Sequence, residues 1–194
     1  MTNDKRRRWK RASAGGGVRG ATPLGSTVMV TLVLAVALQQ PSPVVIDRIV
    51  AVVAAQPIME SDVSAARAFH LVEVPAGTAD PTVYVLRQLI RRTLILAEVD
   101  RLQPPPPDET EITLRVDAIA QRVGSGAVFD RALAVTGMTR DQLRRFVRDD
   151  LRIRTYLLER FGADRPEAEL NAAVDAWIAD LRRRTQVTVL YQPR

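Results

Sequence analysis

Apolar and polar positions form their clearest local pattern over residues 45–63, where a strand-like run leads through a turn into a helix-like run. Residues 46–53 are β-branched or small and apolar apart from one Asp-Arg pair, which predicts a buried strand. Residues 54–56 interrupt this run. Residues 57–59 predict a short return strand, which its proline places at a sheet edge. Ser61 is then the expected N-cap of a helix, with an aspartate after it at the positive end of the helix dipole.

Helical periodicity dominates the rest of the chain. The strongest helix runs from Pro81 to Gln103 with Asp80 as its N-cap. It is apolar on more than one face, so it needs neighbours on several sides. Four consecutive prolines, residues 104–107, end it. The other helices are expected over residues 61–73, over residues 108–123, around residues 129–135, over residues 140–161, and from residue 164 to about residue 184.

Three of these helices begin with a capping signature. Asp108 with Glu111 and Thr139 with Gln142 have the spacing of a capping box. Asp164 opens the last helix with the sequence Asp-Arg-Pro-Glu, which we also interpret as a capped start.

Residues 186–191 alternate apolar and polar side chains and predict a final strand. Pairing with the strand at residues 46–53 would place Val187, Val189 and Tyr191 on one face, against the helices. We therefore expect a mostly α fold, in which a multi-helix core carries a small β-sheet formed by an N-terminal hairpin and the C-terminal strand.

Residues 1–37 have the composition of a secretory signal peptide. They hold seven of the 28 Lys and Arg residues and one of the 22 Asp and Glu residues, and an apolar run begins at Val28. An A-x-A pattern predicts cleavage after Ala37, which leaves a flexible leader over residues 38–44 and one domain over residues 45–194. The alternative is an uncleaved anchor in the inner membrane, although the apolar run is shorter than the roughly 20 residues that span a bilayer.

Removal of this segment changes what the net charge implies about binding partners. The whole chain has a formal net charge of +6 and a pI of about 10.6, which would suggest a nucleic-acid partner. Residues 38–194 keep 21 basic and 21 acidic side chains, so the exported protein is neutral. We expect a periplasmic protein with no nucleic-acid partner, which meets the membrane only through its N-terminal segment.

Side chains that support catalysis or metal binding are scarce. The chain has no cysteine and one histidine, His70, so every Cys-His, Ser-His-Asp or zinc arrangement would depend on that single ring. Asp149 and Asp150 are adjacent on a helix and point about 100° apart, so we expect them to balance nearby arginines rather than to hold a metal. The expectation is a protein without enzymatic activity, cofactor or metal.

The hairpin and the helix after it resemble the opening of the SurA-type periplasmic chaperone and foldase family. The matching residues are Asp47, Arg48, Ile49, Ala51, Val52, Val53, Ile58, Glu60, Ser61, Asp62 and Val63. The turn at residues 54–57 differs, because the family usually has Asn followed by a polar residue or Gly. The later helices and the last strand extend the resemblance over nearly all of residues 45–191.

The resemblance implies the N-terminal core domain of this family without a parvulin isomerase domain, which would need roughly a hundred residues of its own. It implies a holdase-type chaperone that binds unfolded outer-membrane or secreted polypeptides through apolar contacts. Aromatic and methionine side chains suit adaptable recognition. The candidates for client binding are therefore Phe69, Phe129, Met138, Phe146 and Tyr156.

Two alternatives remain open at this point. Each of these five side chains could instead fill the helical core. The protein could also be a non-enzymatic assembly factor that docks on one specific envelope protein, tethered by an uncleaved N-terminal helix.

Overall fold

The computed structural model describes residues 47–124, 126–162 and 164–192. The predicted signal peptide at residues 1–37, the leader at residues 38–44 and the alternative membrane anchor lie outside the described residues. Within the described ranges, no helix is both long enough and apolar enough to cross a membrane.

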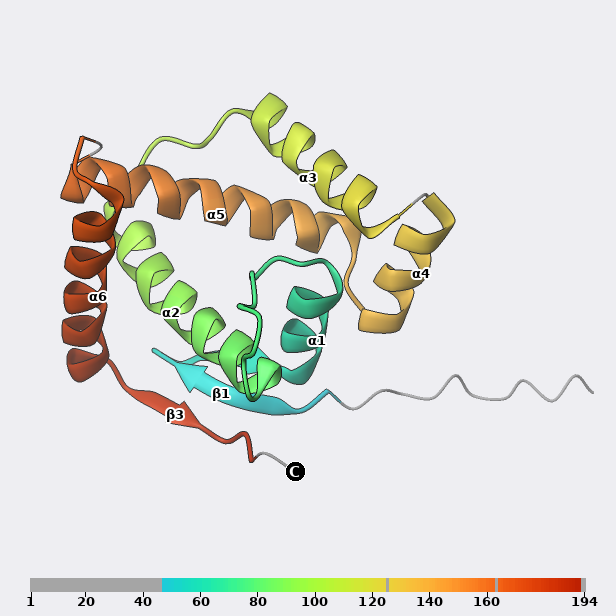
Figure 1. The fold of residues 1–194 in the computed structure, drawn as a ribbon, viewed down its shortest axis with the longest axis horizontal. Coiled ribbons are helices and arrows are strands. Elements are labelled where there is room, and N and C mark those ends of the chain that lie inside the picture. Colours follow the sequence, from blue (N-terminus) through green and yellow to red (C-terminus); the bar gives the residue numbers. More distant parts are fainter. Residues whose placement is uncertain (1–46, 125, 163, 193–194) are drawn as a thin grey trace, which may run out of the picture. The chain divides into compact units, whose positions relative to one another are not determined.

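The described residues form six helices and three strands, which confirms the predicted mostly α fold with a small sheet. In chain order the elements are β1 (Ile49–Val53), β2 (Gln56–Met59), α1 (Glu60–Ala68), α2 (Pro81–Leu102), α3 (Glu109–Val123), α4 (Gly126–Thr136), α5 (Arg140–Phe161), α6 (Glu167–Arg184) and β3 (Val187–Val189). Figure 1 shows α5 crossing α2, with α3 beside α5 and α4 packed near α1. The helix α2 contacts α1, α5, α6 and the hairpin, as its apolar surface requires.

The sheet joins the two ends of the domain. Its order is β2-β1-β3 with both pairings antiparallel, so the expected pairing of the last strand with the hairpin is confirmed. The proline-containing strand β2 lies at one edge, as predicted. The expected face of β3 is wrong in part, because Val187 and Tyr191 are half-buried against the core whereas Val189 is 47% exposed. The strand β3 (Val187–Val189) is also shorter than the predicted residues 186–191 and lies at the other edge of the sheet that the described residues form.

The start of α1 differs from the prediction. The N-cap is Met59, and Ser61 lies inside the first turn of the helix. Asp47, just before β1, accepts hydrogen bonds from the Ser61 N–H at 3.1 Å and from its hydroxyl. A carboxylate fourteen residues earlier in the chain therefore satisfies a helix N-terminus that local capping would otherwise serve. Arg48 and Glu60 add an ion pair of 3.2 Å across the same junction.

The other helix ends follow the sequence signals unevenly. Asp80 caps α2, and Thr139 with Gln142 forms the predicted capping box of α5. Asp108 caps α3, but its expected capping-box partner pairs with an arginine one turn later. Asp164 does not cap α6, which begins after Pro166 without a side-chain cap. The helix expected over residues 61–73 ends at Ala68, because the chain turns through a left-handed residue two positions later, with φ 50°.

The two-residue turn between β1 and β2 is strained. Ala54 and Ala55 have φ values of 49° and 65°, a region that disfavours L-residues with a Cβ atom. Tight hairpin turns with two positive φ angles prefer Asn-Gly.

We predict that replacing Ala54 by Asn and Ala55 by Gly stabilises the domain by about 1 kcal/mol, or roughly 3 °C in Tm. Thermal unfolding followed by circular dichroism measures this. The matched control is Ala97→Gly in the interior of α2, which should lower Tm, since glycine costs a helix roughly 1 kcal/mol. An unchanged or lower Tm for the turn variant would contradict this account of the strain.

Candidate functional site

The structure divides the five predicted client-binding side chains into two groups. Phe69, Phe129 and Tyr156 are buried, with exposures of 0%, 1% and 6%. The rings of Phe69 and Phe129 meet edge to face with centroids 5.7 Å apart, in a core cluster shared by α1, α3, α4 and α5. These three side chains fill the core and form no part of the described surface. Met138 and Phe146 are half-buried and border open space.

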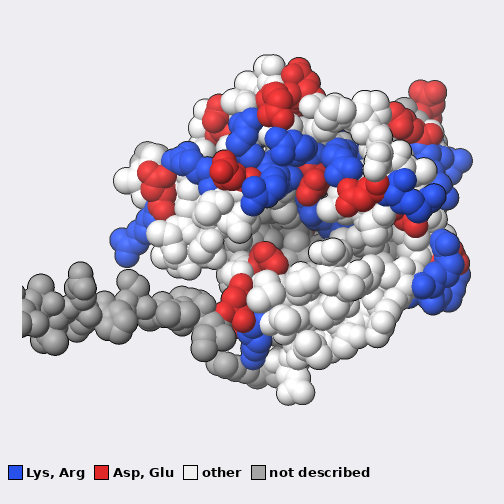
Figure 2. All heavy atoms as spheres, turned by 180° about the vertical axis from the view of Figure 1, so that it is seen from behind, with Lys and Arg blue, Asp and Glu red and all other residues white. Residues whose placement is uncertain are grey.

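Phe146 stands at the centre of a hollowed region that we call the Phe146 cleft. Four pockets, with volumes from about 170 to 340 Å³, share this side chain as a wall. Met138 borders two of these pockets and Leu71 borders three. Seen from behind, the molecule shows a recess between a band of charged side chains and a largely uncharged region (Figure 2). The cleft lies between α5 and the surface formed by α1, α2 and the segment after α1.

Arg92, on α2, lies directly beneath Phe146. Its guanidinium carbon is 3.9 Å from the centroid of the Phe146 ring, a close cation–π contact. Its Nη2 donates to the Phe146 carbonyl oxygen at 2.9 Å and lies 3.8 Å from an Asp149 carboxylate oxygen. Its side chain is 17% exposed. Its Nε atom is buried and has no hydrogen-bond partner among the described residues.

Burial and the neighbouring carboxylates shift the pKa of Arg92 in opposite directions. Burial lowers the pKa of Arg92, while the carboxylates of Asp149, Asp150 and Asp62 raise it. The guanidinium stays protonated, as arginine does in proteins. Burial likewise raises the pKa of Asp62, against the lowering effect of the hydrogen bond from the Met59 N–H at 2.8 Å. One of the two pockets that Met138 borders is lined by two arginines and two aspartates, so its formal charge is zero.

Sequence reasoning missed Arg92, although a signal was present. The positions 85, 89, 92, 96 and 99 follow helical spacing on one face of α2, and the other four hold Val or Leu. A single arginine on an otherwise apolar helix face indicates a charged side chain at the boundary of the core. The adjacent Arg91 pairs with Asp175 on α6 and borders one of the four pockets.

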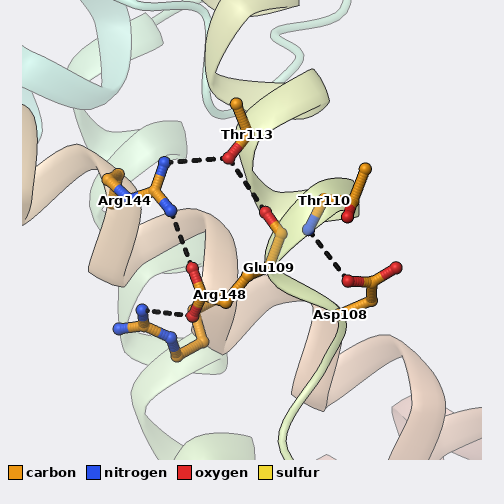
Figure 3. Close-up of polar contacts among 6 residues, drawn as sticks. All are labelled: Asp108, Glu109, Thr110, Thr113, Arg144 and Arg148. Carbon is orange, nitrogen blue, oxygen red and sulfur yellow. Dashed lines mark hydrogen bonds and ion pairs between the residues drawn. The ribbon is translucent and has the colours of Figure 1, made fainter.

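Ion pairs fix α3 against α5 beside the cleft. Glu109, at the start of α3, accepts hydrogen bonds from Arg148 at 2.9 Å and from Arg144 at 2.7 Å (Figure 3). Arg144 also donates to the Thr113 hydroxyl, which in turn donates to the Glu109 carbonyl oxygen. These arginines, Arg148 first, hold the pKa of Glu109 below its ordinary value of 4.5.

We predict that Glu109→Gln lowers Tm at pH 7 and has a shrinking effect as the pH falls. A lowered pKa in the folded state means that Glu109 contributes stability above its ordinary pKa, and that this contribution is lost as the pH falls through the lowered value. The effect is small and sensitive to salt, because Glu109 is exposed. Thermal unfolding from pH 7 down to pH 3 measures it. Glu111→Gln is the control, because it removes an ion pair within α3 and none to α5. A difference between parent and Glu109→Gln that persists at acidic pH would contradict this assignment.

The described residues offer little for other chemistry. They contain no group of three or more His, Cys, Asp or Glu side chains placed to hold a metal ion. His70 is exposed at the turn after α1. Asp149 pairs with Arg92 and with Arg152, and so balances arginines as the sequence suggested. What the cleft offers is a half-buried apolar wall beside a charged side chain with one unused hydrogen-bond donor.

The chain matches no protein-family model and no curated protein sequence.

Proposed function

We propose that this protein is a periplasmic, holdase-type chaperone that binds unfolded outer-membrane or secreted polypeptides in the Phe146 cleft. The observation that carries the proposal is the position of Phe146, a half-buried aromatic side chain bordered by four pockets. A polypeptide laid across these pockets would meet apolar side chains at several points. The resemblance of residues 45–191 to the SurA-type family supports the same proposal.

The composition of the cleft fits a binder with little sequence preference. Met138 has a flexible, polarizable side chain that adapts to ligands of different shape. Leu71 and Phe146 add apolar surface, and the charged residues between them balance one another. Neutral surroundings do not select clients by the sign of their charge. The proposed protein therefore recognises exposed apolar segments rather than one sequence.

We predict that Phe146→Ala and Met138→Ser each raise the concentration needed to suppress aggregation of an unfolded client by about tenfold. The wild-type protein should act at near-stoichiometric ratios, measured by light scattering during dilution of a denatured protein. Val135→Ser is the matched control, because Val135 is 79% exposed on α4 and borders none of the four pockets. Circular dichroism must show that all three variants are folded.

Two results would count against this function. One is wild-type protein that leaves aggregation unchanged even in excess. The other is a Val135→Ser variant that loses as much activity as the two cleft variants, since the effect would then not belong to the cleft. A peptide assay of cis/trans proline exchange with residues 38–194 should show no acceleration, because the proposed chaperone core fills residues 45–194 and an isomerase domain would need roughly a hundred residues of its own.

A second candidate function is assembly with one fixed envelope protein. The observation that favours it is exposed apolar surface at the sheet: Ile49 of β1, Val189 of β3 and Leu190 next to it are 43%, 47% and 53% exposed. Photo-crosslinkers at Met138 and at Leu190, used in the intact envelope, separate the two functions. Many different products from position 138 support the chaperone, whereas one dominant product from position 190 supports the fixed partner.

A further inference from the structure

The buried Nε atom of Arg92 is a donor for which the described residues provide no acceptor. Its other contacts are made by Nη2, which reaches the Phe146 carbonyl oxygen and Asp149. A buried donor without an acceptor is costly, and most such groups in folded proteins have partners. Arg92 also borders three of the four pockets of the Phe146 cleft. An acceptor brought into the cleft by a ligand would therefore gain a hydrogen bond that the free protein lacks.

The charges around Arg92 indicate what kind of hydrogen-bond acceptor a ligand would bring to its Nε–H. Three carboxylates, those of Asp149, Asp150 and Asp62, already act on the guanidinium. The pocket that Arg92 shares with Asp62, Asp149 and Arg145 is already balanced, so a further carboxylate from a ligand would leave it with a net negative charge. A neutral carbonyl oxygen accepts the same hydrogen bond without adding charge, and every residue of an unfolded polypeptide supplies one in its backbone. Backbone recognition also carries no sequence preference, as the proposed function requires.

Phe146 covers the donor in the free protein. The guanidinium carbon lies 3.9 Å from the centroid of its ring, and Phe146 and Arg92 together line three of the pockets. Because the ring is half-buried and faces open space, a change of its side-chain torsion angles would uncover Nε and join neighbouring pockets.

We propose that Arg92 anchors the backbone of a bound polypeptide by donating its Nε–H to a main-chain carbonyl oxygen, after the Phe146 ring turns aside. The inference rests on the proposed holdase function and deepens it. The apolar walls of the cleft bind client side chains, and Arg92 fixes the chain between them. Arg92 is therefore a specificity-determining residue for extended polypeptide over other apolar ligands.

The test measures binding of a short, fluorescein-labelled peptide of serine and tyrosine with no charged side chain, by fluorescence anisotropy. An analogue with central amides replaced by esters has weaker carbonyl acceptors. Arg92→Met keeps the aliphatic part of the side chain but removes the donor. Arg87→Met is the matched control, because Arg87 is exposed on the same helix and borders none of the four pockets. We expect Arg92→Met to weaken binding of the amide peptide about tenfold and Arg87→Met to change it less than about twofold. The ester analogue should bind more weakly than the amide peptide to wild type, and this difference should shrink in Arg92→Met.

A second measurement needs only the folded wild-type protein. The Arg92 Nε–Hε signal in a nitrogen–proton NMR spectrum should move when the amide peptide saturates the protein, and should move less with the ester. An unmoved signal, or equal binding by wild type and Arg92→Met, overturns the anchor and leaves the holdase function standing. Tighter, Arg92-dependent binding of a peptide that carries glutamate would also overturn it, in favour of a carboxylate ligand. A wild-type protein that binds neither peptide overturns both the anchor and the proposed function.

Discussion

Deletion of residues 186–194 is expected to abolish the cooperative thermal unfolding of the domain. The deletion removes β3 and with it the hydrogen bonds that the N–H groups of Leu190 and Tyr191 donate to Val50, and the bond from the Ala54 N–H to residue 186. It also removes Val187 and Tyr191, which pack on the core cluster under the sheet. Together these losses amount to about 5 kcal/mol, which is comparable with the whole stability of a domain of this size.

The matched control for this deletion is Val189→Asp, followed by the same circular dichroism measurement. Val189 is 47% exposed, so the new carboxylate stays in contact with water and should cost less than about 1 kcal/mol. A truncated protein that still unfolds cooperatively within a few degrees of the parent would show that β3 is dispensable. A large loss of stability in Val189→Asp would show that the strand is buried more deeply than described.

Phe69→Ala should destabilise the domain by about 4 kcal/mol and lower Tm by roughly 10 °C. Phe69 is 0% exposed, lies at the end of α1 and meets Phe129 of α4 edge to face. Its removal leaves a cavity in the core cluster shared by α1, α3, α4 and α5, so the cost combines lost burial with lost packing. Thermal and urea unfolding of the parent and the variant measure the change.

Val135→Ala on α4 is the control for this substitution. Its side chain is 79% exposed, so the change in the free energy of unfolding should stay within about 0.5 kcal/mol. Under conditions where Phe69→Ala remains folded, its aggregation suppression should equal that of the parent, because Phe69 lies in the core. Lost suppression in a fully folded variant would return Phe69 to the list of client-binding residues.

Local signals predicted most of the fold. The bounds of α2 and α5, the caps at Asp80 and Thr139, and the pairing of the last strand with the hairpin all follow from short stretches of sequence. The failures have long-range causes. Ser61 has the composition of an N-cap, but Asp47 reaches its N–H from before β1, and no local rule contains that contact.

The candidate site was less predictable than the fold. Large aromatic side chains serve cores and binding surfaces alike, so sequence could not separate the buried Phe69 from the half-buried Phe146. Their difference depends on which helix packs over each ring. Arg92 was missed for a related reason. A charged residue in a helix is interpreted as solvent-exposed unless the residues one turn before and after it are seen to be apolar.

The sheet that joins the two ends of the domain also sets the order in which the protein can be completed. Ala51 pairs with Val189, so β1 lacks one of its neighbours until residue 189 has been made. At the usual rate of protein synthesis, that interval is on the order of ten seconds. During this time the helices can pack through local contacts, but the open edge of β1 remains free to pair with another chain. A protein proposed to guard unfolded polypeptides is thus itself exposed to misassembly until its last strand emerges.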